Sequence, residues 1–355
     1  CRTMSEEAIP KRKRLQKKPL RAPTLNDVAE HAGVSTATVS RYHSNAELVG
    51  EERRRRVEAS IATLEYIPHG AAQALASKRS RTIGAIVPTL DNAIFARGIQ
   101  AFQQRLQNAG YTLFIASSNY SHDEERTQAE TLIARGVDGV MLIGLDHHGQ
   151  LFERFRQKQL PYINTWSFRS DSDHPCIGFN NFDAAVRLTT YLLDIGHIRF
   201  GIIAGITRNN DRAHDRLQGI LHTLSERGLT IPDDMLIECS YDIAVSRQAM
   251  KRLLALAELP TAVICGNDVL AYGALLECQA SGHKIPDDVS IIGFDDLPLS
   301  AHIQPPLTTM HVPSEEMGQK AADYLLACLN GENVPEHAEL EVNLIIRGTT
   351  APPHK

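Results

Sequence analysis

Hydroxyl side chains and a single arginine are concentrated in a short stretch, TLNDVAEHAGVSTATVSR, at residues 24–41. Serine and threonine hydroxyls can donate hydrogen bonds to phosphate oxygens, and an arginine can donate two parallel hydrogen bonds to a guanine edge. These side chains can bind nucleic acid if the chain places them on one surface. The hydroxyl residues of this stretch and of the residues just after it are Thr24, Ser35, Thr36, Thr38, Ser40 and Ser44.

The pattern of the same stretch predicts two short helices joined by a tight turn. Thr24 is a good helix N-cap, and Asp27 follows it at the spacing of a capping box. Gly33 stands where the first helix must stop and reverse, and Ser35 can cap a second helix. Such a pattern is typical of a helix-turn-helix, whose second helix enters the DNA major groove, although an ordinary helical hairpin shows it too. The apolar residues at helical spacing are Leu25, Val28, Ala29, Ala32, Val34 and Val39.

The distribution of charge favours DNA binding by this end of the chain. Residues 1–81 contain 16 Lys and Arg against 9 Asp and Glu, whereas the whole chain has 37 against 42. A basic segment on an acidic body indicates that only the segment meets a polyanion. The run KRKRLQKK at residues 11–18 is either a phosphate-contacting arm or a solvated tail.

A third helix and a linker follow the helix-turn-helix pattern. Residues 51–64 predict a helix that closes a three-helix head, and its four consecutive arginines at 53–56 cannot all face one phosphate. Residues 71–81 favour a helix but are too few to be stable alone. They are either a plain linker or a hinge that becomes helical on DNA, with Leu75 as an apolar wedge in the minor groove.

From residue 82 onward, apolar strand patterns alternate with amphipathic helix patterns. The strand pattern at 83–88, for example, precedes a helix pattern from about residue 95 to 108, and a closing strand is expected near 340–346. Repeated units of this kind are typical of parallel sheets covered by helices on both faces. Because there are more units than one open sheet needs, we expect an α/β fold with two doubly wound subdomains.

Polar side chains come just after several of these strands, where ligands bind in such sheets. Carboxylates and amides can hold sugar hydroxyls, and an arginine can hold a carboxylate or a phosphate. Asp183 and Asp268 have the alternative role of helix N-caps, and Arg216 has a structural alternative. The polar candidates are Asp183, Arg208, Arg212, Arg216, Asn267, Asp268 and Asp295. The aromatic candidates for the walls, which ordinary core packing would also explain, are Phe95, Trp166, Tyr241 and Phe294.

Patterns of catalytic and metal-binding residues are missing from the sequence. No GxGxxG follows a strand and there is no P-loop, HExxH or GxSxG motif, so we expect neither an enzyme nor a cofactor. The six cysteines are scattered without a CxxC pair, and the histidines show no ligand spacing, which predicts no metal site and fits a reducing cytosol. No apolar run reaches transmembrane length, and the first 23 residues lack the apolar core of a secretory signal.

Several motifs in a fixed order resemble the LacI family of bacterial repressors. They are the stretch at 24–41, LEYIPHGAAQALA, GHIRFGIIAG, a GND after a strand, and IPDDVSIIGFDD. The resemblance implies a helix-turn-helix head, a hinge helix and a body like the periplasmic sugar-binding proteins. The implied division is an arm at 1–22, a head at 23–68, a hinge at 69–81 and a body at 82–355. Within the body, one subdomain spans about 82–181 and 311–338, and the other about 182–310 and 339–355.

The resemblance also implies roles for individual residues. Thr36, Ala37 and Arg41 match positions that face base edges, and Leu75 matches an intercalating leucine. Arg216 matches a ligand-contacting arginine, and Asp295 matches a ligand-contacting aspartate. The expected DNA-binding residues are Thr24, Ser35, Thr36, Ala37, Thr38, Ser40, Arg41, Ser44 and Leu75.

Within the family the chain resembles the gluconate-utilisation repressors, through IGFNNFDAAVRLTTYL, LECQASGHKIPDD and TLDNAIFARGIQ. We therefore expect a cytoplasmic repressor, associated with the bacterial nucleoid, that binds a near-palindromic operator as a homodimer. A sugar or a sugar acid, either free or phosphorylated and with gluconate as the first candidate, is expected to act as inducer. The alternative is a sugar-binding transport or receptor protein, which shares the body but has no use for a basic helix-turn-helix head.

Overall fold

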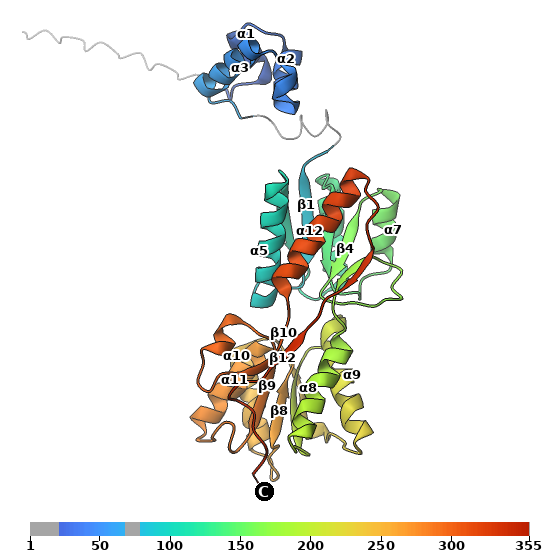
Figure 1. Ribbon diagram of the computed structural model, residues 1–355, viewed down its shortest axis with the longest axis vertical. Helices are drawn as coiled ribbons and strands as arrows, with labels where there is room; N and C mark the ends of the chain where they lie inside the picture. Colours follow the sequence, from blue (N-terminus) through green and yellow to red (C-terminus); the bar gives the residue numbers. More distant parts are fainter. Residues whose placement is uncertain (1–20, 68–78, 355) are drawn as a thin grey trace, which may run out of the picture. The chain divides into compact units, whose positions relative to one another are not determined.

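The computed structural model describes residues 21–67 and 79–354, and the chain divides into two compact units between Ser80 and Arg81 (Figure 1). The arm at 1–20 and the hinge residues 68–78, with Leu75 among them, lie outside the described residues. The first unit, which we call the head, contains α1 (Leu25–Ala32), α2 (Thr36–Ser44), the 3-10 helix η1 (Ala46–Leu48) and α3 (Glu51–Leu64).

The local signals of the helix-turn-helix are all present in the head. The Asp27 carboxylate accepts a hydrogen bond of 2.6 Å from the Thr24 N–H, and the Thr24 hydroxyl accepts one from the Asp27 N–H. Gly33 ends α1 with a φ of 61°, and the Ser35 hydroxyl accepts a hydrogen bond of 3.2 Å from the Thr38 N–H at the start of α2. The predicted helix-turn-helix is therefore confirmed.

A small core and one arginine hold the three head helices together. The Arg56 guanidinium donates a hydrogen bond of 2.9 Å to the Gly33 carbonyl and fills the space that a side chain at position 33 would need. Arg54 and Arg55 pair with glutamates of their own helix. Most of the arginine run therefore serves α3 and the turn. The buried core residues are Val28, Ala29, Ala32, Val39, Val57 and Tyr66.

The first sheet of the second unit, the body, has the strand order β11-β5-β4-β3-β1-β2 and is parallel throughout. Its strands are β1 (Thr82–Val87), β2 (Thr112–Ser117), β3 (Gly139–Ile143), β4 (Tyr162–Thr165), β5 (Cys176–Gly178) and β11 (His337–Glu339). Its helices are α5 (Ala93–Asn108), α6 (His122–Ala134), α7 (Gln150–Gln157) and α12 (Ser314–Asn330).

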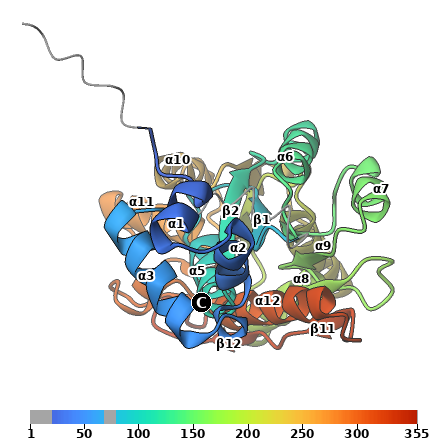
Figure 2. The ribbon, with the colours of Figure 1, turned by 90° about the horizontal axis from the view of Figure 1, so that it is seen from above.

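Alternate side chains of the buried strand β1 enter two different cores, as its pleat requires. Ile83 and Val87 pack with residues of α5 and α12, whereas Ile86 packs with residues of α6 and α7. Figure 2 shows these two pairs of helices on opposite sides of the strands. This is the double cover that the apolar strand pattern predicts.

The second sheet has the order β12-β10-β9-β8-β6-β7 and is parallel except for the β10–β12 pair. Its strands are β6 (Phe200–Gly205), β7 (Leu236–Cys239), β8 (Ala262–Cys265), β9 (Ser290–Asp295), β10 (Thr308–His311) and β12 (Asn343–Ile345). Its helices are α8 (Asn181–Asp194), α9 (Asp211–Glu226), α10 (Ile243–Leu254), α11 (Asp268–Ala280), η2 (Asp233–Met235) and η3 (Pro298–Ala301). We call the parts built on the two sheets the first half and the second half of the body.

The structure differs from the expected pattern near the C-terminus and at two helices. The closing strand expected at 340–346 is limited to β12, because the chain crosses there from β11 in the first sheet to the second sheet. Helices α7 and α10 were not predicted. In α7 only Leu151 and Phe155 are buried among mostly polar residues, so its apolar face is short. The predicted fold class is confirmed: a helix-turn-helix head is followed in the chain by two α/β subdomains, each built on a mainly parallel sheet.

Candidate functional site

In the head, α2 exposes three of the side chains that the sequence assigns to DNA. Thr36, Ala37 and Arg41 are exposed, and Ala37 and Arg41 lie one helical turn apart on the same face. Such a surface can enter a groove, because its first turn carries only small side chains. Ser35 and Thr38 share a hydrogen bond of 2.9 Å at the N-terminus of the helix.

Two other predicted DNA-contacting residues, Thr24 and Ser40, are only partly exposed. Thr24 caps α1, and its hydroxyl donates a hydrogen bond of 2.6 Å to Asp27. Ser40 is half-buried in α2, and Ser44 is the last residue of that helix. If Thr24 contacts a DNA phosphate, its hydroxyl has to do so while it also caps α1.

In the body, residues that follow the carboxyl ends of strands in both halves line one cleft. Those from the first half are Asn92, Ile94, Phe95, Tyr120 and Trp166, and those from the second half are Asn210, Arg212, Arg216, Tyr241, Asn267 and Asp295. Ligands of open α/β sheets bind at such ends. The cleft therefore brings together seven of the predicted site residues: Phe95, Trp166, Arg212, Arg216, Tyr241, Asn267 and Asp295.

Arg216 is held rigidly in this cleft. Its Nε donates a hydrogen bond of 2.9 Å to Asn181 Oδ1, and its Nη1 donates one of 2.9 Å to the Gly266 carbonyl. The guanidinium carbon lies 3.7 Å from the centroid of the Phe294 ring. Phe294, which was predicted to form a wall of the site, therefore stacks against the arginine and supports it. A guanidinium has five N–H groups, and these contacts leave others to bind oxygen atoms of a ligand.

Asp295 lies beside Arg216 in a strained conformation. Its Oδ1 is 3.9 Å from Arg216 Nη1, and its backbone has a φ of 121°, which a residue with a side chain rarely adopts. Burial raises the pKa of Asp295 to about 8, although the charge of Arg216 opposes that rise. A carboxyl group with such a pKa is mostly protonated at neutral pH and can donate a hydrogen bond to a ligand oxygen.

Asp211 and Arg212, at the start of α9, connect the two halves across the cleft. Asp211 Oδ2 accepts hydrogen bonds of 2.8 Å from the Leu145 N–H and 2.7 Å from the Ser167 hydroxyl, both in the first half. Arg212 Nη1 donates to the Ile143 carbonyl at 3.1 Å and to Asp211 at 2.7 Å. We call these four contacts the bridge. They leave about 20 Å³ of free volume in the cleft, room for about one water molecule.

Two buried donors in the cleft walls have no hydrogen-bond partner among the described residues. They are the indole N–H of Trp166 and the Nδ2 group of Asn267. Buried polar groups are normally satisfied, so orphaned donors at a cleft indicate an absent acceptor. The Trp166 ring packs edge-on against Phe95, with the ring centroids 5.5 Å apart, and is fixed in place by that contact.

Four predicted site residues do not line this cleft: Phe294, which packs under Arg216, and Asp183, Asp268 and Arg208. Asp183 is exposed in the first turn of α8 and accepts a hydrogen bond of 2.5 Å from Asn180. Asp268 is fully buried, and its carboxylate accepts hydrogen bonds from Ser300, Thr309 and the Leu297 N–H. Arg208 lines a neighbouring pocket. Asp268 thus supports the loop that follows β9.

Sequence reasoning missed Asn92, Tyr120 and Asn210 as cleft residues. Tyr120 follows β2 and Asn210 follows β6, so the rule about strand ends that selected the other residues could have found both. Tyr120 has a φ of 58° and Trp166 a φ of 64°, which places two aromatic side chains of the cleft on left-handed backbone.

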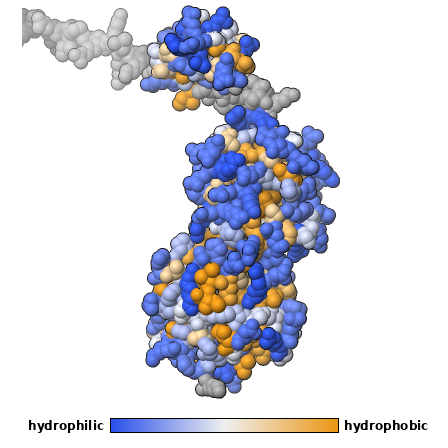
Figure 3. Space-filling view, viewed as in Figure 1, coloured by the Kyte–Doolittle hydropathy of each residue, from blue (hydrophilic) through white to orange (hydrophobic). Residues whose placement is uncertain are grey.

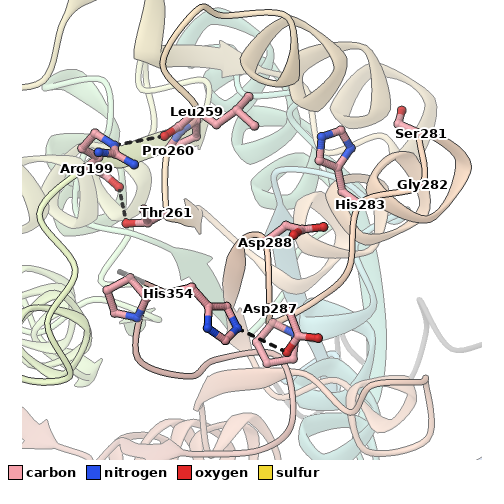
Figure 4. Close-up of a pocket in the computed structure, with 12 residues that line it drawn as sticks. Arg199, Leu259, Pro260, Thr261, Ser281, Gly282, His283, Asp287, Asp288 and His354 are labelled. Carbon is pink, nitrogen blue, oxygen red and sulfur yellow. Dashed lines mark hydrogen bonds and ion pairs between the residues drawn. The ribbon is translucent and has the colours of Figure 1, made fainter.

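A separate hollow of about 750 Å³ lies at the opposite ends of the second-sheet strands, near the start of β6, β8 and β9 (Figure 4). His354 Nε2 lies 3.9 Å from Asp287 Oδ1 there, and Arg199 Nε donates to the Leu259 carbonyl at 3.2 Å. These charged groups are exposed and of both signs, which is typical of solvated surface.

Within 21–67 and 79–354, no group of three or more His, Cys, Asp or Glu side chains is arranged to hold a metal ion. No helix in those ranges combines the length and the apolar character needed to span a bilayer.

Two family models match the chain. The model for bacterial regulatory proteins of the lacI family matches residues 24–69, and that for a periplasmic binding protein-like domain matches residues 189–350. The HTH-type transcriptional repressor CytR of Escherichia coli (strain K12) is 35% identical over 338 residues, which cover 94% of this chain and 98% of the relative.

Solved structures agree with these matches. The lac repressor dimer bound to operator and the anti-inducer ONPF is 29% identical with a TM-score of 0.83, and the match covers 93% of this chain and 100% of that one. The transcription regulator GntR from Chromobacterium violaceum is 28% identical with a TM-score of 0.72, covering 76% of this chain and 98% of that one.

A helix-turn-helix head and a two-half body of the periplasmic-binding type define a DNA-binding regulator with an effector-binding domain. The relationship to known proteins makes the assignment more specific. This chain belongs to the LacI family of bacterial regulatory proteins and is a transcriptional repressor, not an enzyme.

Proposed function

We propose that this chain represses transcription in the bacterial cytoplasm as a homodimer on a near-palindromic operator, and that a sugar acid induces its release from DNA. The observation that carries the proposal is the pair of unpartnered donors, Trp166 Nε1 and Asn267 Nδ2, in a cleft that also holds Arg216. A ligand rich in oxygen atoms satisfies all three.

Gluconate is the first candidate for the effector. Arg216 supplies N–H groups for a carboxylate, and the protonated Asp295 can donate to a hydroxyl. Asn267 adds an amide N–H that matches a polyhydroxylated chain. The aromatic side chains Phe95 and Trp166 cover the apolar faces of such a molecule.

For the DNA, we propose that residues 23–68 form the reading head and residues 69–81 the hinge. Arg41 reads a guanine, and Thr36 and Ala37 contact neighbouring bases. Leu75 acts as a wedge in the minor groove. The residues assigned to phosphate contacts are Thr24, Ser35, Thr38, Ser40 and Ser44.

The apolar surface of the body supports a dimer. The edge strand β2 exposes Phe114 and Ile115. Because an uncovered apolar edge strand promotes aggregation, proteins normally cover such a strand, and a second copy of the chain would do so here. Further exposed apolar residues are Ile243 and Val245 on α10 and Leu276 on α11. Figure 3 shows hydrophobic patches that interrupt the hydrophilic surface of the body. Sedimentation at micromolar concentration should give a dimer, and a stable tetramer would contradict this assembly.

In the mechanism we propose, the effector changes the angle between the two halves. Its binding has to break the bridge made by Asp211 and Arg212, because the closed cleft has too little space for a sugar. The altered halves then change the spacing of the two heads in the dimer. A ligand shifts this balance only by its difference in affinity for the two states, typically about 1–3 kcal/mol.

Thermal unfolding of the purified protein with gluconate, 2-ketogluconate and neutral hexoses tests the effector. A ligand that binds the folded state raises the melting temperature by mass action. We expect a rise with the sugar acids, and the same compounds should release a labelled operator in a binding titration. A rise with neutral hexoses only would contradict the sugar-acid assignment, and stabilisation without operator release would contradict induction.

A further inference from the structure

A second cavity, of about 320 Å³, opens beside the cleft. Tyr120, Asn210 and Tyr241 line both spaces, so the cavity and the cleft share a wall. Because Tyr120 belongs to the first half and Tyr241 to the second, this cavity also lies between the halves. We call it the side pocket.

The shared wall is formed mainly by two tyrosines. Their ring centroids lie 6.4 Å apart, and Asn210 Nδ2 donates a hydrogen bond of 3.3 Å to the Tyr241 hydroxyl. Tyr241 packs where a side chain at Gly205 would stand, which fixes the position of its ring. When the halves separate to admit a ligand, Tyr120 and Tyr241 move with different halves, so a ligand can extend between them from the cleft into the side pocket.

The polar lining of the side pocket suits an anion. None of its lining residues carries a carboxylate, and its polar lining consists of Asn119, Ser121, Arg208, Asn209 and Ser240. The Asn119 amide donates to Glu124 and the Asn209 amide donates to the Tyr120 carbonyl at 3.1 Å, so the groups left to bind an anion are the Arg208 guanidinium and the two serine hydroxyls. Nearby carboxylates are occupied by other donors. Glu124 accepts a hydrogen bond from Asn119, and Glu238 accepts two from Thr207.

Three helices begin at this pocket. Ser121 is the N-cap of α6, Asn210 is the N-cap of α9, and Tyr241 directly precedes Asp242, the N-cap of α10. Each helix N-terminus carries a partial positive charge. Carboxylates at these helix ends offset that charge: Asp123, Glu124 and Glu125 in α6, Asp211 in α9 and Asp242 at α10. Arg208, whose guanidinium can hold two oxygens of one phosphate, is therefore the group that binds an anion here.

We propose that the side pocket is a second compartment of the effector site and binds a phosphate group at the end of the effector remote from Arg216. The inference rests on the proposed effector site in the cleft and specifies the effector as a phosphorylated sugar or sugar acid. Arg216 and Asp295 hold one end of this molecule, the two tyrosines flank its middle, and Arg208 holds the phosphate.

Calorimetric titration of the full-length protein without DNA tests the proposal with two matched pairs: gluconate with 6-phosphogluconate, and glucose with glucose 6-phosphate. We expect the phosphorylated member of at least one pair to bind about tenfold tighter or more, because the phosphate adds charged hydrogen bonds that its partner lacks. Arg208→Gln should abolish this preference by weakening the binding of the phosphorylated member far more than that of the unphosphorylated one. The matched control is Arg135→Gln, which removes an exposed arginine at the other end of α6 and should keep the preference.

Inorganic phosphate gives a second readout that does not depend on the identity of the sugar. At matched ionic strength in sodium chloride, phosphate should raise the melting temperature of the wild type and of Arg135→Gln but not that of Arg208→Gln. Equal affinity within both pairs, or an equal phosphate effect on all three proteins, overturns the proposal. A phosphate effect lost in Arg208→Gln, without any response to sugar acids, would keep the side pocket and overturn the sugar-acid effector instead.

Discussion

The carboxylate of Asp211 accepts a hydrogen bond of 2.7 Å from the hydroxyl of Ser167, and these two residues belong to opposite halves of the body. Asp211 is also the ion-pair partner of Arg212, whose guanidinium reaches the carbonyl of Ile143 in the first half. Burial alone would raise the pKa of Asp211, but Arg212 and the hydrogen bonds from Ser167 and Leu145 lower it. Asp211 is therefore ionised, and its charged hydrogen bonds join the two halves across the cleft.

Ser167→Ala should make effector binding stronger. The substitution removes one contact of the closed state, a hydrogen bond to the ionised Asp211 that is worth about 1.5–3 kcal/mol, and so lowers the free energy needed to open the cleft. We expect about 10- to 150-fold tighter binding of whichever sugar acid stabilises the wild type, measured by calorimetry. Ser290→Ala is the control, because that serine hydroxyl bonds Ala351 within the second half. Weaker binding by Ser167→Ala would mean that the serine contacts the ligand itself.

Arg216→Ala should separate DNA binding from effector response. Arg216 lies in the body and bonds only residues of the second half, so operator affinity should stay within about twofold of the wild type. The sugar acid should no longer release the operator. Arg216→Lys should also fail to respond, because an ammonium group cannot reproduce the planar fork or the stacking on Phe294.

The control for both variants is Arg187→Ala, which removes an exposed arginine of α8 and should behave as the wild type. Loss of operator binding together with a lower melting temperature in Arg216→Ala would show that this arginine is chiefly structural.

Local signals explain why the head could be predicted from the sequence. The caps of Thr24 and Ser35 and the turn at Gly33 depend on residues at most a few positions away. In the body, local apolar patterns also predict where the strands end. These patterns placed Asn267 and Asp295 near one another, because parallel strands bring their carboxyl ends to one edge, whereas Arg216, inside α9, was assigned through the family resemblance.

Contacts between distant residues explain what the sequence could not predict. Asp183 and Asp295 both follow strands, yet only packing decides that Asp183 faces solvent and Asp295 the cleft. The bridge joins residues 66 positions apart, Leu145 and Asp211, and no local pattern marks it. Arg212 was assigned to the ligand for its type, whereas in the structure its guanidinium bonds Ile143.

Arg41→Ala should weaken specific operator binding far more than binding to unrelated DNA. A bidentate contact with guanine is worth about 1–3 kcal/mol of discrimination, which corresponds to about 5- to 150-fold in affinity. Competition titrations at fixed salt measure both quantities. Arg55→Ala is the control, since that exposed arginine pairs with Glu51 on α3 and should change specific and non-specific binding alike. An equal loss on both DNAs in Arg41→Ala would assign Arg41 to a phosphate.

Asp295 should make the stability of the body depend on pH. Burial raises its pKa from 3.8 to about 8, so between these values the folded state binds a proton that the unfolded chain does not. The free energy of unfolding then falls as the pH rises through this window, and the loss is complete above the folded pKa. Asp295→Asn cannot ionise, so its melting temperature should fall less than that of the wild type between about pH 6 and pH 9.

The same ionisation should weaken effector binding. Above about pH 8 the carboxyl group loses the proton that it donates to a ligand oxygen, and its negative charge repels the carboxylate of a sugar acid. We expect the affinity of the wild type to fall across this pH range and that of Asp295→Asn to stay nearly constant, because an amide donates at every pH. Asp183→Asn, which changes an exposed aspartate outside the cleft, should follow the wild type. Parallel pH profiles for the wild type and Asp295→Asn would show that Asp295 is already ionised at neutral pH, with Arg216 rather than burial controlling its pKa.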